Sequence, residues 1–388
     1  MIYTFYSYKG GVGRSMALAN VAELFYRSGM KVLMVDWDLE APGLERFFPV
    51  DLEETLGKPG VIEMLLRYKE QMAQDLPISE DETAPLPLDR PDQFTVDVYP
   101  DATGKGRLWL LPAGRRSQEH FAEYAYAVRT FDWQDFYENW EGELYFEWLR
   151  QQFERIADVV LIDSRTGVTE IGGICTYQLA DTVVMFCAAN KQSLDGTHEM
   201  AQNFMDPRVQ SVRRGRPLNF LIVPARIEMA EGDLLDKFQE DFMGLFKDSV
   251  PRAQRIDTQE LWQLGIPYIP KYAFTEAVAV REKDLASAAP MAAAFFRLKE
   301  AMDWLRVRQL VHTRPAGILE PGAELFGYRV LEFVGEGGWA YVYKARHPKL
   351  PKVVAIKQLK PELVEDEGTL QRFLREANIV ARLNHPTW

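Results

Sequence analysis

The residues with the clearest chemical potential form the heptapeptide KGGVGRS at positions 9–15. It combines three glycines with two cations and a hydroxyl, at Lys9, Arg14 and Ser15. Glycines let successive backbone N–H groups turn towards a phosphate, and the positive end of a following helix adds to the attraction. A serine hydroxyl at the start of that helix can bind Mg²⁺. The heptapeptide therefore predicts a nucleotide phosphate loop, with contacts from Gly10, Gly11, Val12, Gly13, Arg14, Ser15 and Met16.

The elements around this loop must place it between a strand and a helix. Residues 1–8 are rich in β-branched and aromatic side chains, which predicts a strand. Residues 14–29 carry apolar side chains at helical spacing and end at a glycine, and residues 31–36 (KVLMVD) are typical of a buried strand. A glycine loop in this strand–helix context is a credible phosphate site.

The rest of the chain predicts an α/β fold. Buried-type strands are expected at 107–113, 158–163, 181–189 and 218–225, and helices at 143–156 and 232–246. Strands that alternate with helices imply right-handed crossovers. We therefore expect three layers, a mostly parallel sheet with helices on both faces, as in P-loop NTPases.

Composition limits the classes of partner. The 388 residues are 47% hydrophobic, enough for a sizeable core, and the formal net charge is -12. An acidic chain is not expected to bind DNA, although the basic cluster at 208–216 is a local exception. The most apolar stretch, 183–189, is too short to cross a bilayer, and the two cysteines suggest neither a disulfide framework nor a metal site. We predict a cytoplasmic protein without a membrane partner.

Four segments suggest the domain organisation. Residues 74–93 are acidic and proline-rich, which predicts an exposed insertion. The aromatic-rich segment 121–140 either packs against the domain body, which we favour, or forms a partner surface. Residues 290–311 predict an amphipathic helix that packs on the core rather than on a membrane. Residues 312–327 are typical of a linker, so the predicted domains are 1–311 and 328–388.

The phosphate loop resembles the deviant Walker A motif, KGGxGK[ST], of the ParA/MinD group of P-loop ATPases. VLMVDWDLEAPG (32–43) is similar to the second motif of that family, and VVLIDSRTG (159–167) to its Walker B strand. IPYIPKYAFTEAVAVREK (266–283) is similar to the loop near the nucleotide base. The resemblance covers roughly residues 1–305 in motif order.

The resemblance implies a role for each matching residue. Lys9 matches the signature lysine that reaches across a homodimer to the partner's nucleotide, so its charge serves the other subunit. Asp38 matches the carboxylate that orients the attacking water. Ser15, Asp36 and Asp163 match the residues that hold Mg²⁺. The implied protein is an ATP- and Mg²⁺-dependent, dimerising ATPase, with a further protein partner that the sequence does not identify.

Arg14 departs from the family pattern, because the motif has lysine at this position. A guanidinium can still contact the β- and γ-phosphates, but it is larger and planar. Small misplacements slow catalysis, so we expect slow hydrolysis. The alternative is a nucleotide-binding scaffold that does not hydrolyse ATP and regulates a fused kinase. Arg165 either senses the γ-phosphate or is an ordinary surface arginine.

The base site is weakly encoded. The guanine-selecting Asn-Lys-x-Asp signature is absent where FLIVPARIE (220–228) occupies the corresponding strand end, which favours ATP over GTP. We predict base-side contacts from Pro224, Arg226, Pro270 and Tyr272. A partitioning ATPase that associates with DNA or with a membrane is a less favoured interpretation.

The C-terminal segment resembles the start of a serine/threonine protein kinase. Residues 328–347 match the glycine-rich loop, with Gly335 and Gly337, although Ala340 replaces its third glycine. Lys357 matches the phosphate-pairing lysine and Glu376 its helical partner. The His-Arg-Asp and Asp-Phe-Gly motifs do not occur before residue 388, so we expect no kinase activity from this chain.

Overall fold

The computed structural model describes residues 1–73, 89–167, 173–207, 209, 213, 216–247, 256–282, 285–312, 319, 321–325, 328–336, 340–346 and 353–359. The chain divides into two compact units, Met1–Asp303 and Trp304–Trp388. The predicted linker falls mostly outside the described residues, and the domain boundary at residue 311 stays a prediction.

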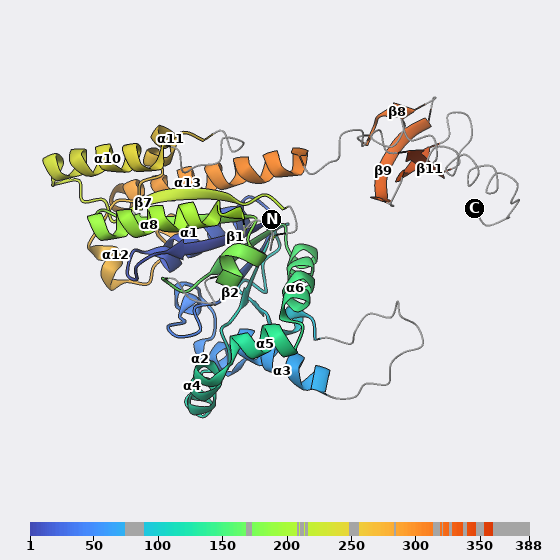
Figure 1. The fold of residues 1–388 in the computed structure, drawn as a ribbon, viewed down its shortest axis with the longest axis horizontal. Helices are drawn as coiled ribbons and strands as arrows, with labels where there is room; N and C mark the ends of the chain where they lie inside the picture. The colour runs from blue at the N-terminus through green and yellow to red at the C-terminus, as the bar shows by residue number, and fades with distance from the viewer. Residues whose placement is uncertain are drawn as a thin grey trace, which may run out of the picture. The chain divides into compact units, whose positions relative to one another are not determined.

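A seven-stranded sheet forms the centre of the first unit (Figure 1), in the order β3-β4-β2-β5-β1-β6-β7. All neighbouring strands are parallel except β3, which pairs antiparallel with β4 at the edge. The strands are β1 (Ile2–Ser7), β2 (Lys31–Asp36), β3 (Val96–Asp97), β4 (Arg107–Leu111), β5 (Val159–Asp163), β6 (Thr182–Ala188) and β7 (Asn219–Ala225). The predicted α/β fold with a mostly parallel sheet is confirmed.

Helices connect these strands. They are α1 (Arg14–Arg27), α2 (Leu52–Gly57), α3 (Val61–Ala73), α4 (Phe121–Thr130), α5 (Trp133–Asn139), α6 (Gly142–Ile156), α8 (Lys191–Phe204), α10 (Gly232–Phe246), α11 (Thr258–Gln263), α12 (Lys271–Phe274) and α13 (Leu285–His312). Short helical turns occur at Leu44–Phe47, Pro91–Phe94, Ile174–Leu179 and Ala279–Arg281. The predicted bounds of these strands and helices match the observed ones within two residues, except that α13 begins five residues earlier than predicted. Strand β4 ends before Pro112, which has no N–H to donate.

Successive side chains along each strand point to opposite faces of the sheet. Both faces can therefore pack against helices, and helices cover both. The Thr4 hydroxyl donates to the Cys175 carbonyl oxygen on one face, at 2.7 Å. The neighbouring Tyr3 hydroxyl donates to the Met302 carbonyl oxygen on α13, at 2.5 Å, on the other face. Helix α1 lies on the α13 face, since the Lys299 ammonium is 5.4 Å from the Phe25 ring. The first face is covered by α6 and the Ile174–Leu179 turn.

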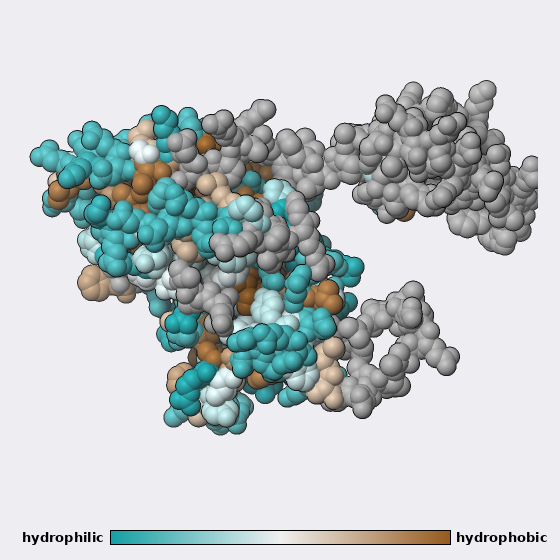
Figure 2. All heavy atoms as spheres, in the orientation of Figure 1, coloured by the Kyte–Doolittle hydropathy of each residue, from teal (hydrophilic) through white to brown (hydrophobic). Residues whose placement is uncertain are grey.

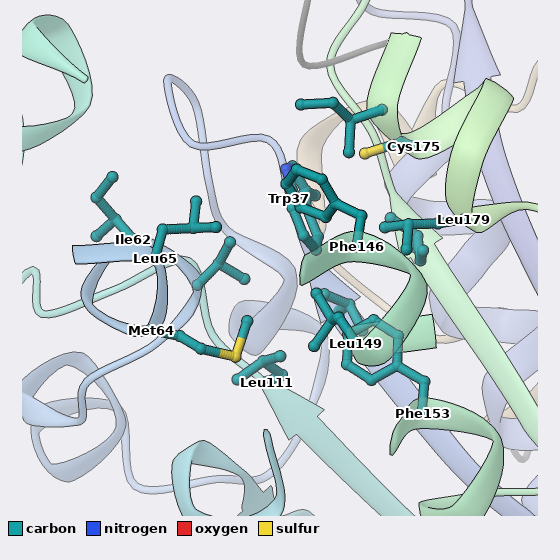
Figure 3. Close-up of a cluster of buried hydrophobic side chains, with 14 of the residues drawn as sticks. Trp37, Ile62, Met64, Leu65, Leu111, Phe146, Leu149, Phe153, Cys175 and Leu179 are labelled. Carbon is teal, nitrogen blue, oxygen red and sulfur yellow. The ribbon is translucent and has the colours of Figure 1, made fainter. Parts of the chain in front are cut away.

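A large hydrophobic cluster joins α6 to the sheet and to α3 (Figure 3). Phe146, Leu149 and Phe153 follow one side of α6, and the Phe146 ring lies 6.1 Å from that of Trp37. Ile62 and Leu65 of α3 belong to the same cluster. This apolar packing fixes the carboxyl ends of β2 and β5, where the predicted carboxylates lie.

The aromatic-rich segment 121–140 packs only in part against this body. Trp133 and Phe136 are buried in the cluster, as we favoured. Phe121 and Tyr126 on α4 are instead 58% and 63% exposed. One side of α4 is therefore available on the surface.

Two further predictions concern the surface of the protein. Residues 74–88 of the predicted insertion lie outside the described residues, whereas Pro91 near its end is buried, as is Phe94 just after it. The described side chains on the face in Figure 2 are mostly hydrophilic, with smaller hydrophobic areas between them. Within the described residues, no helix has the length and apolar character that a bilayer span requires.

The second unit contains a small antiparallel sheet in the order β11-β10-β9-β8. Its strands are β8 (Glu324–Leu325), β9 (Tyr328–Glu336), β10 (Ala340–Arg346) and β11 (Val353–Leu359), around buried Val330, Tyr341 and Tyr343. Gly335 lies in β9, and Lys357 lies in β11 opposite Val342. Gly337 and Glu376 lie outside the described residues.

Candidate nucleotide site

The loop between β1 and α1 has the backbone that its glycines predict. Gly11 and Gly13 have φ angles of 72° and 88°, in the left-handed region that side chains other than glycine rarely adopt. The Val12 side chain is buried and anchors the loop. Helix α1 begins at Arg14, so its positive end adjoins the glycines. This arrangement can bind an anion through backbone N–H groups.

The loop encloses one side of a cavity of about 470 Å³, which we call the cradle. Its lining includes eight predicted site residues: Gly10, Gly11, Val12, Gly13, Arg14, Ser15, Met16 and Asp38. It also includes Ser7, Glu40, Ala41, Phe47, Arg165 and Thr166. The cradle thus joins the ends of β1, β2 and β5, where a ligand is expected in an open α/β sheet.

Arg14 contacts two carboxylates. Its Nε donates to Asp163 Oδ1 at 2.6 Å, and its Nη2 donates to Asp38 Oδ2 at 2.8 Å. The Arg14 side chain is only 7% exposed. Burial opposes the charge, but Asp163 and Asp38 hold the pKa of Arg14 above its ordinary value. The guanidinium is therefore a fixed cation between the two acids that the resemblance assigns to metal and water.

Asp36 is the third carboxylate of the site and is also buried. Its Oδ2 accepts the N–H groups of Gly43 and Leu44, at 3.0 and 3.2 Å. Burial, together with the nearby charge of Asp163, raises the pKa of Asp36 to about 7. Among the described residues, its Oδ1 has no hydrogen-bond partner. The charge of Arg116 opposes the rise in the pKa of Asp36, but no described cation contacts Asp36 as Arg14 contacts Asp163.

These residues fit a magnesium ion in part. The unpartnered Asp36 Oδ1 is a polar atom that a cation or its water would satisfy, and the Ser15 hydroxyl lines the cradle. Asp163 already has a cationic partner in Arg14. Within the described residues, no group of three or more His, Cys, Asp or Glu side chains is arranged to hold a metal.

Neither Lys9, the first residue of the loop, nor Arg226, which contacts the loop, lines the cradle. The Lys9 ammonium donates to Gln192 in the first turn of α8. Arg226 donates to the Gly11 carbonyl oxygen at 3.1 Å, and its guanidinium lies 4.8 Å from the centre of the Tyr268 ring. Arg226 also has a φ of 56°, a strained value for a residue other than glycine. Of the four predicted base-side residues, Arg226 therefore has a direct contact with the loop.

The other base-side predictions lie apart from the cradle lining. Pro224 is buried in β7 opposite Cys187, and Tyr272 is buried in α12. Pro270 is exposed immediately before α12. Their proposed contact with a base stays a prediction.

Sequence reasoning missed five cradle residues, namely Ser7, Glu40, Ala41, Phe47 and Thr166. Arg165, left open above, forms an ion pair with Glu40 across the cradle. Glu40 lies two residues after Asp38 and Arg165 two residues after Asp163. The available signal was that both residues follow closely after the carboxyl ends of the adjacent strands β2 and β5.

A close helix contact also supports the loop. A Cβ added at Gly196 on α8 would lie 2.3 Å from the Tyr8 ring, so α8 approaches the loop only because residue 196 has no side chain. The Ser7 hydroxyl donates to the Lys9 carbonyl oxygen at 2.8 Å. Tertiary packing therefore fixes the first residues of the loop.

Solved structures similar to this chain include cell-division and partition ATPases. The MinD protein of Pyrococcus horikoshii, complexed with Mg-ADP, is 17% identical, with a TM-score of 0.47 over 78% of this chain and 96% of that one. Apo McdA from Cyanothece is 15% identical, with a TM-score of 0.49 over 78% and 98%. A ParA family ATPase from Chlorobium tepidum is 15% identical, with a TM-score of 0.42 over 78% and 96%. TM-scores below 0.5 at such identities assign no activity to this chain.

Curated relatives match a short segment and are kinases. The serine/threonine-protein kinase pkn3 of Myxococcus xanthus is 49% identical over 61 residues, 16% of this chain and 11% of that protein. PknJ of Mycobacterium tuberculosis is 44% identical over 68 residues, 18% of this chain and 12% of that protein. The chain thus spans about a tenth of these relatives. No protein-family model matches the chain.

Proposed function

We propose that this chain is an ATP-binding, magnesium-dependent ATPase switch of the ParA/MinD type, which dimerises with nucleotide and hydrolyses it slowly in the cytoplasm. The observation that carries the proposal is the cradle. Its loop has left-handed Gly11 and Gly13, a helix that starts at Arg14, and acidic side chains at the adjoining strand ends. A phosphate chain needs this combination of backbone donors and nearby acids that position cation and water.

In this proposal, different residues of the chain bind the phosphates, the Mg²⁺ ion and the attacking water. Backbone N–H groups of residues 10–15 bind the phosphates, while Ser15 and Asp36 hold Mg²⁺ directly or through water. When bound, this ion neutralises charge on the phosphates. Asp38 positions the attacking water, provided that it gives up part of its contact with Arg14. Slow hydrolysis follows, because breaking that contact precedes the chemical step.

The cradle is tested by adding a side chain to its backbone. A Cβ at Gly10 would meet no protein atom within 4 Å, so Gly10→Val is compatible with the fold but obstructs a ligand that approaches the backbone. We expect ATP affinity, measured by calorimetry with Mg²⁺, to fall by about a hundredfold. Gly104→Val is the matched control, because its Cβ also meets nothing and it lies outside the cradle. Equal ATP affinity of both variants would contradict the proposed site.

Dimerisation rests on Lys9. Its ammonium does not line the cradle of its own chain, which leaves it to serve a second copy. Sedimentation velocity with Mg²⁺ and a non-hydrolysable ATP analogue should show a dimer for the native chain. The Lys9→Ala variant should stay monomeric while still binding nucleotide. A native chain that sediments alike with and without nucleotide would refute the switch.

A second candidate function is a nucleotide-bound scaffold without turnover that regulates a fused kinase. The observation in its favour is the contact of Arg14 with Asp163 and Asp38, which engages the two acids needed for hydrolysis. Phosphate release by the native chain and by Arg14→Lys separates the candidates. Turnover only in the lysine variant would favour the scaffold, whereas turnover in both would favour the ATPase.

Partitioning on DNA remains the less favoured function. Of the basic cluster, Arg213 and Arg216 are described. Arg213 donates to the carbonyl oxygens of Tyr177 and Ala180, at 2.5 and 2.9 Å. Arg216 pairs with Glu147 at 3.0 Å. These two guanidinium groups form hydrogen bonds and an ion pair within the protein. They are therefore poorly placed to bind DNA phosphates.

A further inference from the structure

A second cavity, larger than the cradle, lies between the segment after β2 and helices α4 and α5. Its volume is about 870 Å³, within the range of small-molecule sites in proteins. It shares Glu40, Ala41 and Arg165 with the cradle, but none of the loop glycines lines it. We call it the arginine pocket, after Arg46, Arg116, Arg129 and Arg165 in its wall.

The pocket concentrates positive charge in an acidic protein. Four arginines and one glutamate, Glu40, line it, whereas the whole chain carries a net charge of -12. Arg116 is fixed by a two-pronged contact with Glu45, at 2.9 and 3.3 Å, and Arg165 pairs with Glu40. Arg46 and Arg129 are exposed and form no ion pair among the described residues. Two guanidinium groups are therefore available for an anion.

The same cavity also has an apolar wall. Phe121 and Val128 of α4 line it together with Phe131 and the largely buried Trp133. Phe121 is 58% exposed although it is a large apolar side chain. Phe121 therefore places exposed apolar surface in the same wall as Arg46 and Arg129.

We infer that the arginine pocket binds a small amphiphilic anion, with a phosphate or carboxylate group on an aromatic or apolar body. Arg129 and Arg46 bind the anionic group, and the α4 wall with Phe121 covers the apolar body. A concave site of this volume favours a small molecule over a flat protein surface. The pocket shares Glu40, Ala41 and Arg165 with the cradle but has none of its loop glycines, so the inference does not depend on ATP binding and stands if the proposed function fails.

The fluorescent dye 8-anilino-1-naphthalenesulfonate is a suitable probe, because it combines one anionic group with aromatic rings. We expect the full chain to bind one dye molecule, and Arg129→Glu to weaken the affinity by about tenfold or more. Arg155→Glu is the matched control: Arg155 is an exposed helical arginine on α6, also without an ion pair among the described residues. It should change the affinity by less than about twofold. Equal effects of the two variants would overturn the inference.

Two further measurements locate the dye and define the ligand. Gly10→Val, which alters the cradle, should leave dye binding unchanged; loss of binding would place the dye in the cradle and overturn the inference. Phenyl phosphate or phenylacetate should displace the dye at lower concentration than inorganic phosphate or benzyl alcohol, and the better of the two identifies the anionic group. Inorganic phosphate has only the anionic group and benzyl alcohol only the apolar body. If either displaced the dye as effectively as phenyl phosphate or phenylacetate, the pocket would not need both features, which would contradict the inference. Absence of dye binding would also refute it and favour a protein partner on this face.

Discussion

The cradle and the arginine pocket are neighbours that share Glu40, Ala41 and Arg165, yet they are built from different parts of the chain. The cradle consists mainly of one continuous loop whose backbone faces the cavity. The pocket consists of side chains from three separated segments, around residues 39–56, 116–133 and 165. Their arginines differ as well, since Arg14 is fixed by two acids and Arg129 by none among the described residues.

This difference teaches that an arginine in a cavity wall serves either the fold or a ligand, depending on its partners. A buried guanidinium between carboxylates is part of the structure, because removing it leaves buried charge without compensation. An exposed guanidinium contributes little to stability and keeps its donors for a ligand. The following predictions test that distinction.

Arg14→Ala should have the largest effect. It leaves Asp163 and Asp38 without their shared cation, so we expect the free energy of unfolding to fall by about 3 kcal/mol. Urea unfolding of the nucleotide-free chain measures this loss. Arg129→Ala is the comparison from the pocket and should change the value by less than about 0.5 kcal/mol. A small loss in Arg14→Ala would show that the two arginines do not differ as proposed.

Arg116→Ala should have the next largest effect and shows that the pocket also contains a structural arginine. Glu45 is only 1% exposed and would lose both contacts with Arg116. We expect a loss of about 2 kcal/mol in the free energy of unfolding. Arg46→Ala, from the same wall but exposed, should be nearly neutral. Similar losses in both variants would remove the distinction within the pocket.

Gly196→Ala should weaken the cradle without affecting the pocket. The added methyl group would lie only 2.3 Å from the Tyr8 ring, so the ring must move. Because Tyr8 adjoins the loop, the start of the loop would move with it. We expect ATP affinity to fall by about tenfold, with dye binding unchanged. Gly244→Ala on α10 is the control, because its Cβ meets nothing within 4 Å. Calorimetry and dye fluorescence on both variants decide the outcome.

Phe121→Ala should have the smallest effect. The side chain is 58% exposed, so we expect stability to stay within about 0.5 kcal/mol of the native value. Dye affinity should fall by about threefold, because one face of apolar contact is lost. Tyr126→Ala, which is similarly exposed on α4 but does not line the pocket, should leave dye affinity unchanged. A reduced dye affinity in Tyr126→Ala would indicate nonspecific binding to α4.

Much of the fold and part of the cradle could be predicted from local sequence. The strand–glycine–helix order around residues 1–27 and the buried strands ending at Asp36 and Asp163 follow from residue types and periodicity. The exposed side of α4 could not be predicted in this way. Phe121 and Phe136 are both aromatic, but Phe136 is buried against Trp133 and Tyr145 whereas Phe121 is 58% exposed. Periodicity indicates which side chains share a face, and it does not indicate which face is covered.

The sequence by itself determined the backbone of the loop at residues 9–15, because glycine at positions 11 and 13 permits the left-handed conformation that both residues adopt. It also determined which strand ends carry carboxylates. Only the tertiary structure decided that Arg14 contacts Asp163, 149 residues away, and that Arg46, Arg129 and Arg165 line one cavity. The physical reason is that charged side chains find partners through space, and folding of the β2, β5 and α4 segments sets which charges meet.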